Sequence, residues 1–203
     1  MHLSQLPEPT STAARAALAV AGEYCSPALL NHSVRSYLWG AALGVSAGLE
    51  FDAELLYVSA LLHDLGLVEA FDNHRLPFEE AGGHVARVFA AGAGWPPERG
   101  ARAAEIIVRH MREPVEPADD AEGFLLQRAT SLDISGRRVD SVPVELRAEV
   151  LERWPRLSLA TEFSACFADQ AARKPDSEAA AAVRSGIAAR LDGNPLETEG
   201  SRP

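Results

Sequence analysis

The spacing of apolar residues constrains the fold more than any other feature of this chain. Through the segment 29–45 they recur every three or four positions, at Leu29, Leu30, Val34, Leu38, Ala41, Ala42 and Val45. That spacing gathers them on one face of an α-helix. No segment shows a sustained alternation of apolar and polar residues, which is the pattern of a half-buried strand. The sequence therefore predicts an all-α protein, a single-domain helical bundle with short connections.

Cap residues and prolines mark where the helices should begin. Ser26 followed by Pro27 is a strong start signal, and Asp52 offers a second cap. We expect helices over residues 12–24, 27–45, 53–65, 78–91, 97–111, 121–134, 144–154, 158–172 and 177–191. Residues 1–10 and 193–203 are expected to be flexible ends, which leaves residues 11–192 as the domain.

Composition excludes several classes of partner. The 203 residues suffice for one domain, and their net charge of −10 would repel nucleic acid and anionic membranes. No run approaches the roughly 18 apolar residues of a spanning helix, and no secretory signal is visible. Cys25 and Cys166 are far apart in the sequence and are typical of thiols in a reducing compartment. We therefore expect a cytoplasmic protein that acts on a small molecule, with no nucleic-acid or membrane partner.

The sequence also leaves room for a homodimer. Gly40, Gly44 and Gly48 recur every fourth residue, so one helix face could approach another helix closely. Trp95, in a proline-rich turn, is a large apolar residue that could be exposed at an interface.

A histidine and an aspartate lie side by side at the end of an apolar helical run, as His63 and Asp64 in the stretch Leu61–Gly66. Adjacent polar groups are costly to bury unless something pairs with them, and a divalent metal ion would do so. Further candidate metal ligands lie on other predicted helices, at His32, His84, His110 and Asp133. Each alone could be an ordinary helix-end or turn residue, but together with His63 and Asp64 they form an ordered set. Imidazole and carboxylate ligands suit zinc, iron, manganese, nickel or cobalt.

The order His32, His63-Asp64, Asp133 resembles the HD-domain superfamily of metal-dependent hydrolases. The segments 31–37, 62–67, 78–79 and 133–136 are similar to its cyanamide hydratase-like branch, so the match covers about residues 26–140. The resemblance implies an HD-type bundle with one zinc ion, held by the two histidines and two aspartates of that pattern. Binuclear members carry two more histidines in the interval that holds His84 and His110, so a second ion at those residues stays open.

The resemblance also implies a hydration reaction on a nitrile or cyanamide. A metal-activated water would attack the carbon, with Asp64 both a ligand and the acceptor of the water proton. Glu79 or His110 would return a proton to the substrate nitrogen. Asn31 and Arg35 flank His32 in the sequence and are expected to bind substrate.

Three other functions use the same residues. An HD phosphohydrolase acting on a nucleotide or phosphomonoester would need cations for the phosphate, which could come from Arg35, Arg75, Arg109, Arg112 and Arg137. A di-iron HD-type oxygenase would use all six metal candidates. A non-enzymatic helical sensor or interaction domain would keep only a structural metal.

Overall fold

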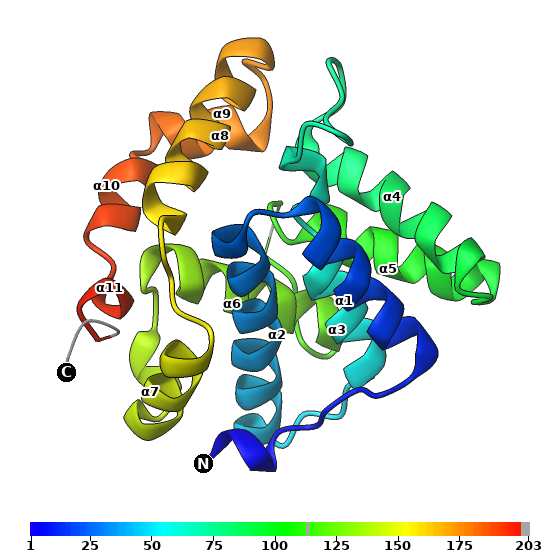
Figure 1. The fold of residues 1–203 in the computed structure, drawn as a ribbon, viewed down its shortest axis with the longest axis vertical. Coiled ribbons are helices and arrows are strands. Elements are labelled where there is room, and N and C mark those ends of the chain that lie inside the picture. The colour runs from blue at the N-terminus through cyan, green and yellow to red at the C-terminus, as the bar shows by residue number, and fades with distance from the viewer. Residues whose placement is uncertain (113, 200–203) are drawn as a thin grey trace.

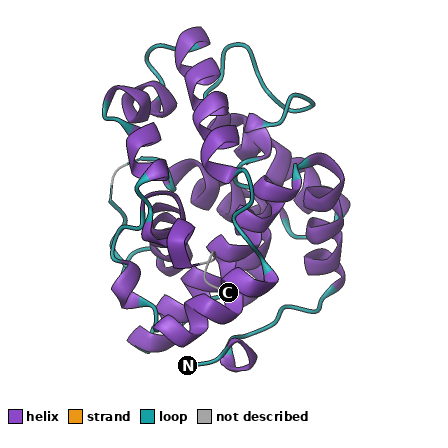
Figure 2. Cartoon of the chain, turned by 60° about the vertical axis from the view of Figure 1, so that its left-hand side comes forward, coloured by secondary structure: helices purple, strands orange, loops and turns teal. Residues whose placement is uncertain are grey.

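The computed structural model describes residues 1–112 and 114–199. Its helices are α1 Thr12–Tyr24, α2 Pro27–Ala47, α3 Ala53–Leu62, α4 Phe78–Gly92, α5 Pro97–Arg109, α6 Ala121–Ser135, α7 Val144–Arg153, α8 Leu159–Arg173, α9 Glu178–Arg184, α10 Ile187–Asp192 and α11 Pro195–Glu199. Three short 3₁₀ helices are η1 Leu3–Gln5, η2 Leu65–Leu67 and η3 Val139–Ser141. No strand occurs among these residues, which confirms the all-α prediction (Figure 2).

Helix α2 forms the centre of the bundle (Figure 1). It packs against α3 on one side and α6 on another, and it also meets α1 and α8. Both neighbouring helices approach Gly40 closely, since a Cβ there would be in van der Waals contact with Leu56 at 3.4 Å and with the backbone oxygen of Leu125 at 3.5 Å. Trp39 and Tyr37 on the same helix are buried. The central helix is therefore enclosed, and polar residues on its buried faces must find partners inside the protein.

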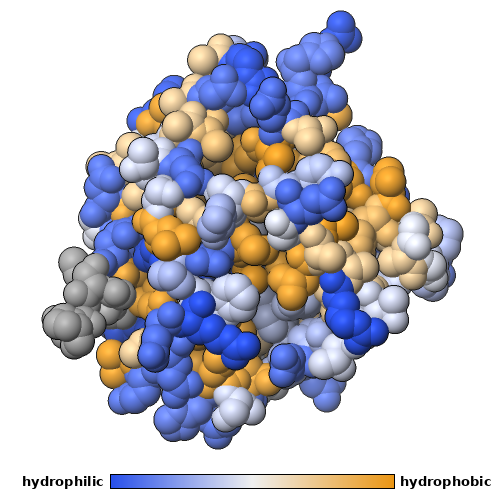
Figure 3. Space-filling model, viewed as in Figure 1, coloured by the Kyte–Doolittle hydropathy of each residue, from blue (hydrophilic) through white to orange (hydrophobic). Residues whose placement is uncertain are grey.

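The glycines expected at a dimer interface have a different role. Gly40 and Gly44 are buried inside the bundle, where a Cβ on Gly44 would lie 2.6 Å from the Phe51 ring. Trp95 is half-buried and stacks under the Arg99 guanidinium, 4.4 Å from the ring centroid. On the face shown in Figure 3, apolar and polar residues are interspersed. Gly40, Gly44 and Trp95 thus pack within one chain, and Gly48 ends α2 in the left-handed conformation with φ +62°. Dimerisation stays a prediction without support from these residues.

Helix α3 ends at Leu62, three residues earlier than predicted. The chain then turns through His63 and Asp64 into η2, which packs against the start of α4. Gly66 is required at this contact, because a Cβ there would lie 1.9 Å from the Phe78 carbonyl oxygen. The histidine and aspartate are thereby fixed at a helix end that faces the interior.

Described residues of both predicted flexible segments, 1–10 and 193–203, pack against the domain. Leu6 and Leu196 are buried in one cluster with Trp39, and the Tyr37 hydroxyl donates a hydrogen bond to the Pro7 carbonyl. Residues 200–203 lie outside the described part of the chain. The predicted helix 177–191 is divided into α9 and α10 by Gly186, whose φ of +81° is open to glycine but rare for other residues. Over residues 1–112 and 114–199, no helix combines the length and apolar character needed to cross a bilayer.

Candidate metal centre

His63 and Asp64 enter the site from the end of α3. The Nδ1 atom of His63 lies 2.7 Å from the Ala60 carbonyl oxygen, which can only accept a hydrogen bond. Nδ1 therefore carries a proton whether the ring is neutral or charged, and in the neutral ring Nε2 keeps its lone pair. That Nε2 lies 3.2 Å from Oδ2 of Asp64, and both side chains are buried. One bond to the backbone thus fixes the tautomer and leaves the free nitrogen beside the carboxylate.

His32 completes a three-residue group from the first turns of α2. Its Nδ1 lies 2.7 Å from Oδ2 of Asp133, and its Nε2 lies 3.4 Å from Oδ2 of Asp64. Ligand atoms of His32, His63 and Asp64 all lie within 4.8 Å of one another. No other such group of three or more histidine, cysteine or acidic residues occurs in the described part of the chain.

The donor atoms of this group make no hydrogen bonds within the protein. Both Nε2 atoms of the histidines and both oxygens of Asp64 are buried without a hydrogen bond. Buried polar atoms are rarely left unpaired, because each unpaired group costs free energy. Two imidazoles and one carboxylate suit a divalent transition metal, so the residues present fit such an ion.

The electrostatics of His32 show how strongly the two aspartates act on it. Burial favours the neutral imidazole, yet the hydrogen bond to Asp133 and the negative charge of Asp64 outweigh burial and raise the pKa of His32. The same interactions act on Asp64. Burial would raise the pKa of its carboxyl, but His63 and His32 together lower it far below the ordinary range. A bound cation would take the place of the proton on this group, since both compete for the same lone pairs.

Asp133, predicted as a metal ligand, lies behind His32 and outside the three-residue group. Its Oδ1 accepts hydrogen bonds from Arg35 Nε at 2.8 Å and Trp39 Nε1 at 2.7 Å. Its Oδ2 accepts from His32 Nδ1 at 2.7 Å and Arg35 Nη2 at 2.8 Å. Burial acts to raise the pKa of Asp133, but the Arg35 guanidinium holds it well below the ordinary value. In this arrangement the carboxylate orients His32 from behind.

Asn31 and Arg35, predicted to bind substrate, have structural partners instead. The remaining nitrogen of Arg35, Nη1, donates hydrogen bonds to the carbonyls of Trp154 and Pro155, at 2.9 and 3.1 Å. The Asn31 amide donates to the same Pro155 carbonyl at 2.8 Å. Both side chains therefore fasten the connection between α7 and α8 onto α2. The prediction of substrate contacts is wrong for Arg35, because each of its nitrogens is already bonded.

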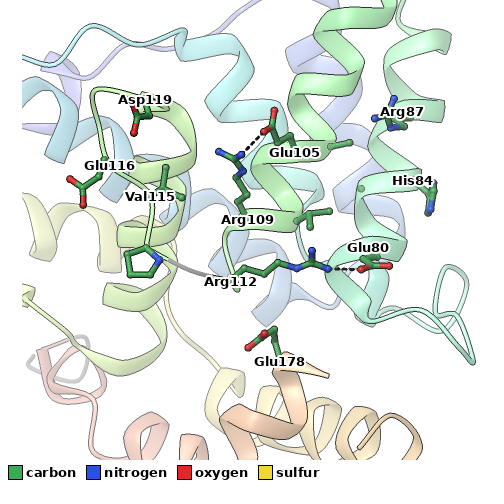
Figure 4. Close-up of a pocket in the computed structure, with 14 residues that line it drawn as sticks. Glu80, His84, Arg87, Glu105, Arg109, Arg112, Val115, Glu116, Asp119 and Glu178 are labelled. Carbon is green, nitrogen blue, oxygen red and sulfur yellow. Dashed lines mark hydrogen bonds and ion pairs between the residues drawn. The ribbon is translucent and has the colours of Figure 1, made fainter. Parts of the chain in front are cut away.

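The two remaining histidines lie in different surroundings. His110 caps α5 and is buried, with its ring 4.9 Å from that of His63. Burial, aided by His63, lowers the pKa of His110 to about 3, so its imidazole is neutral. His84 is exposed on α4, where it lines an outer cavity of about 1050 Å³ with Glu80 and Arg87 (Figure 4). A second metal site formed by His84 and His110 is therefore not assembled.

Like His32 and His63, His110 binds an oxygen acceptor through Nδ1. Its Nδ1 lies 2.5 Å from the Ile107 carbonyl oxygen, so the proton is on Nδ1 and Nε2 is unprotonated. His32, His63 and His110 thus each bind an acceptor through Nδ1 and keep Nε2 as a potential donor to a metal.

The comparison with protein families agrees with this geometry. The model of the HD domain matches residues 29–153, which is more than half of the chain. The chain belongs to the HD-domain family. It is also similar to two proteins of Saccharomyces cerevisiae, "Cyanamide hydratase DDI2" and "Cyanamide hydratase DDI3". Each is 28% identical to it over 174 residues, spanning 84% of this chain and 77% of the relative.

These matches confirm the resemblance seen in the sequence. Members of the HD-domain family bind divalent metals, and His32, His63 and Asp64 are the group in this HD domain that could bind one.

Glu79, predicted as a proton donor, is buried in the first turn of α4. Its Oε2 has no hydrogen-bond partner, and burial raises the pKa of the carboxyl, which favours the protonated form. The preceding residue, Phe78, places its ring 5.9 Å from that of His110. Glu79 is the next residue on that helical turn, and the charged residues that act on its carboxyl are Arg112, Glu80 and Glu178.

Sequence reasoning missed several residues that support the site. Trp39 lies seven positions after His32, on the same helical face, and this spacing could have identified it. Arg156 donates to the Asp133 backbone carbonyl at 2.6 Å, and Asn194 donates to the same oxygen at 2.8 Å. Neither residue lies in a motif, because their contacts depend on how the last helices of this HD domain fold back.

Proposed function

We propose that this protein is a metal-dependent hydratase or hydrolase that adds water to a small uncharged molecule with a nitrile-type carbon, such as cyanamide. The observation that carries the proposal is the buried group of His32, His63 and Asp64, whose facing donor atoms lack partners. The names of the two yeast relatives support the choice of reaction. Zinc is the ion we propose. His110 and Asp133 both lie outside the three-residue group, but both oxygens of Asp133 already accept hydrogen bonds, so we propose the free Nε2 atom of His110 as the fourth ligand.

A divalent ion in this site would lower the pKa of a water molecule and so supply a nucleophile near neutral pH. Asp64 has two oxygens, so one can bind the ion while the other accepts a proton from the attacking water. Glu79 would hold the proton needed by the substrate nitrogen, since burial keeps its carboxyl protonated to higher pH. The water oxygen would bond to the nitrile carbon while one C–N π bond becomes an N–H bond, and the proton on Asp64 would finally replace the one lost by Glu79. From cyanamide this addition gives isourea, which becomes urea when its O–H proton moves to the imine nitrogen.

The charges around the site favour an uncharged substrate over a phosphomonoester. Of the five arginines that could have bound phosphate, Arg35 is fully bonded to Asp133 and to backbone carbonyls. The other four are exposed: Arg75, Arg109, Arg112 and Arg137. Arg156 retains one buried nitrogen, Nη2, without a partner. One nitrogen is a weak match for the several oxygens of a phosphate, which usually binds arginine through two parallel hydrogen bonds.

An oxygenase and a sensor have less support than a hydratase. A di-iron oxygenase would need His84 among its ligands, and that residue is exposed on α4. A sensor with a structural metal would not require a buried carboxylic acid such as Glu79 with an unpaired oxygen. Turnover measurements separate both of these functions from hydration.

The test combines metal analysis with a panel of substrates. We expect about one equivalent of zinc per chain and conversion of cyanamide to urea, with p-nitrophenyl phosphate left intact. His63→Ala should lose both the metal and turnover, whereas His84→Ala, the matched control on the outer surface, should retain both. Full activity without bound metal, or a preference for the phosphate ester, would contradict the proposal.

A further inference from the structure

Six aromatic side chains form a closed circuit of ring contacts at the site. In order around the circuit they are His32, His63, His110, Phe78, Phe167 and Phe163. The successive centroid distances are 5.2, 4.9, 5.9, 5.5, 4.5 and 5.6 Å. Each of the six residues is at most 6% exposed. Half of the circuit therefore offers nitrogen donors, and the other half, which we call the phenylalanine wall, offers only carbon and hydrogen.

We infer that the phenylalanine wall, formed by Phe78, Phe163 and Phe167, sets the size and polarity of the substrate, with Phe163 as the principal specificity-determining residue. This inference rests on the proposed function, because it names what limits the substrate at that same site. Phe163 forms the end of the wall next to His32, since its ring meets His32 edge-on at 5.6 Å and stacks on Phe167 at 4.5 Å. Phe163 is thus the phenylalanine in direct ring contact with the His32 donor.

The wall is fixed because α8, which carries Phe163 and Phe167, is fastened at both ends. Next to Phe163, Glu162 accepts a hydrogen bond from the Ser26 hydroxyl at the start of α2. At the other end, Asp72 accepts hydrogen bonds from Gln170 at 2.8 Å and from the buried Lys174 at 2.9 Å. Moving α8 aside would break these contacts, so the rings that face the donors are carried by a helix held at both ends.

The chemistry of the wall defines the class of substrate it would accept. Phenyl rings offer no hydrogen bond to an ion, and burying an unpaired charge is expensive. Their packing against the histidines also leaves little width, which favours a narrow molecule over a branched or aromatic one. We therefore assign the site to narrow, uncharged nitriles of about the size of cyanamide, with aromatic nitriles excluded by Phe163.

Two readouts on the full chain test the assignment, one with turnover and one without. Cobalt(II) in place of zinc allows neutral nitrogen ligands to be followed by visible absorption, and imidazole and 4-phenylimidazole are the probes. In Phe163→Ala we expect the preference for imidazole over 4-phenylimidazole to fall by about tenfold or more, a range typical of removing part of an apolar pocket. The zinc protein should show a similar rise in kcat/KM for benzonitrile relative to cyanamide.

Controls separate a specific effect from general loosening. Phe124→Ala truncates a half-buried phenylalanine that stacks with Arg128 outside the circuit, and it should leave both ratios unchanged. If Phe163→Ala does not fold, Phe163→Leu keeps an apolar side chain without the ring and should shift both ratios in the same direction by less.

The outcomes distinguish the two proposals. If the wild type hydrates cyanamide but neither ratio changes in the Phe163 variants, the wall assignment is overturned and the proposed function stands. If cyanamide is not hydrated while the imidazole preference still depends on Phe163, the proposed function fails and the wall assignment stands. Failure of the wild type to bind cobalt overturns both.

Discussion

Asp133→Asn tests most directly whether this aspartate orients His32 or binds the metal itself. The carboxylate accepts four hydrogen bonds, two of them from the fully buried Arg35. An amide removes the negative charge and turns one acceptor into a donor, which faces other donors. Arg35 is then a buried cation without its counter-charge, and breaking such a pair costs about 3–5 kcal/mol. For a chain of this length that loss corresponds to a decrease of about 6–20 °C in Tm.

The assay is urea unfolding of the metal-free protein, followed by metal titration of the folded variant. Trp39→Phe is the matched control, because it removes one hydrogen bond to the same carboxylate and no charge. It should cost about 1.5–3 kcal/mol, the usual value for a bond to a charged group. Metal affinity should fall about 10–100-fold in Asp133→Asn, as is typical when a residue that orients a ligand is lost.

One combination of results would refute this reasoning. If Asp133→Asn is within about 1 kcal/mol of the wild type in stability, the network with Arg35 carries little of the folding free energy. If the same variant also binds no metal at all, Asp133 is itself a ligand, as the family resemblance implied.

Three further predictions concern other residues of the site and its supports. Loss of an orienting residue typically lowers metal affinity about 10–100-fold, and His110→Ala should lower it by more, as measured by competition with a chelator. If the variant binds metal as tightly as the wild type, His110 is not a ligand. Because the pKa of Glu79 is raised in the folded protein, the folded protein keeps a proton at pH values above 4.5 that the unfolded chain has lost. The free energy of unfolding should therefore fall as pH rises above 4.5. Glu79→Gln should remove this pH dependence, measured by urea unfolding between about pH 4.5 and pH 8. Asp72→Asn leaves the buried Lys174 ammonium without its counter-charge and should destabilise the protein by about 1–3 kcal/mol, an effect that Lys174→Met in the same chain should partly relieve.

The features that the sequence determined are local ones. Helical periodicity and caps such as Ser26 before Pro27 act within a few residues, so the start of α2 follows from the sequence alone. His63 and Asp64 are adjacent in the chain, and a polar pair at the end of an apolar helix already indicated that something must compensate it. His32 and the family membership followed from the same ordered pattern. These inferences needed no knowledge of which helix packs against which.

Tertiary packing decided the role of each remaining polar residue. Whether Asp133 faces a metal or the back of His32 depends on the guanidinium of Arg35, which α2 supplies from a position 98 residues away in sequence. His84 and His110 look equivalent in the sequence, but a helix turns about 100° per residue, so small differences in register send one outward and the other inward. The phenylalanine wall needs α8 to fold back over α2, and no local pattern encodes that contact. The sequence by itself determined the helices and the identity of the central donors, because those depend on neighbours in the chain; the structure alone decided which side chains surround them, because that depends on how distant helices pack.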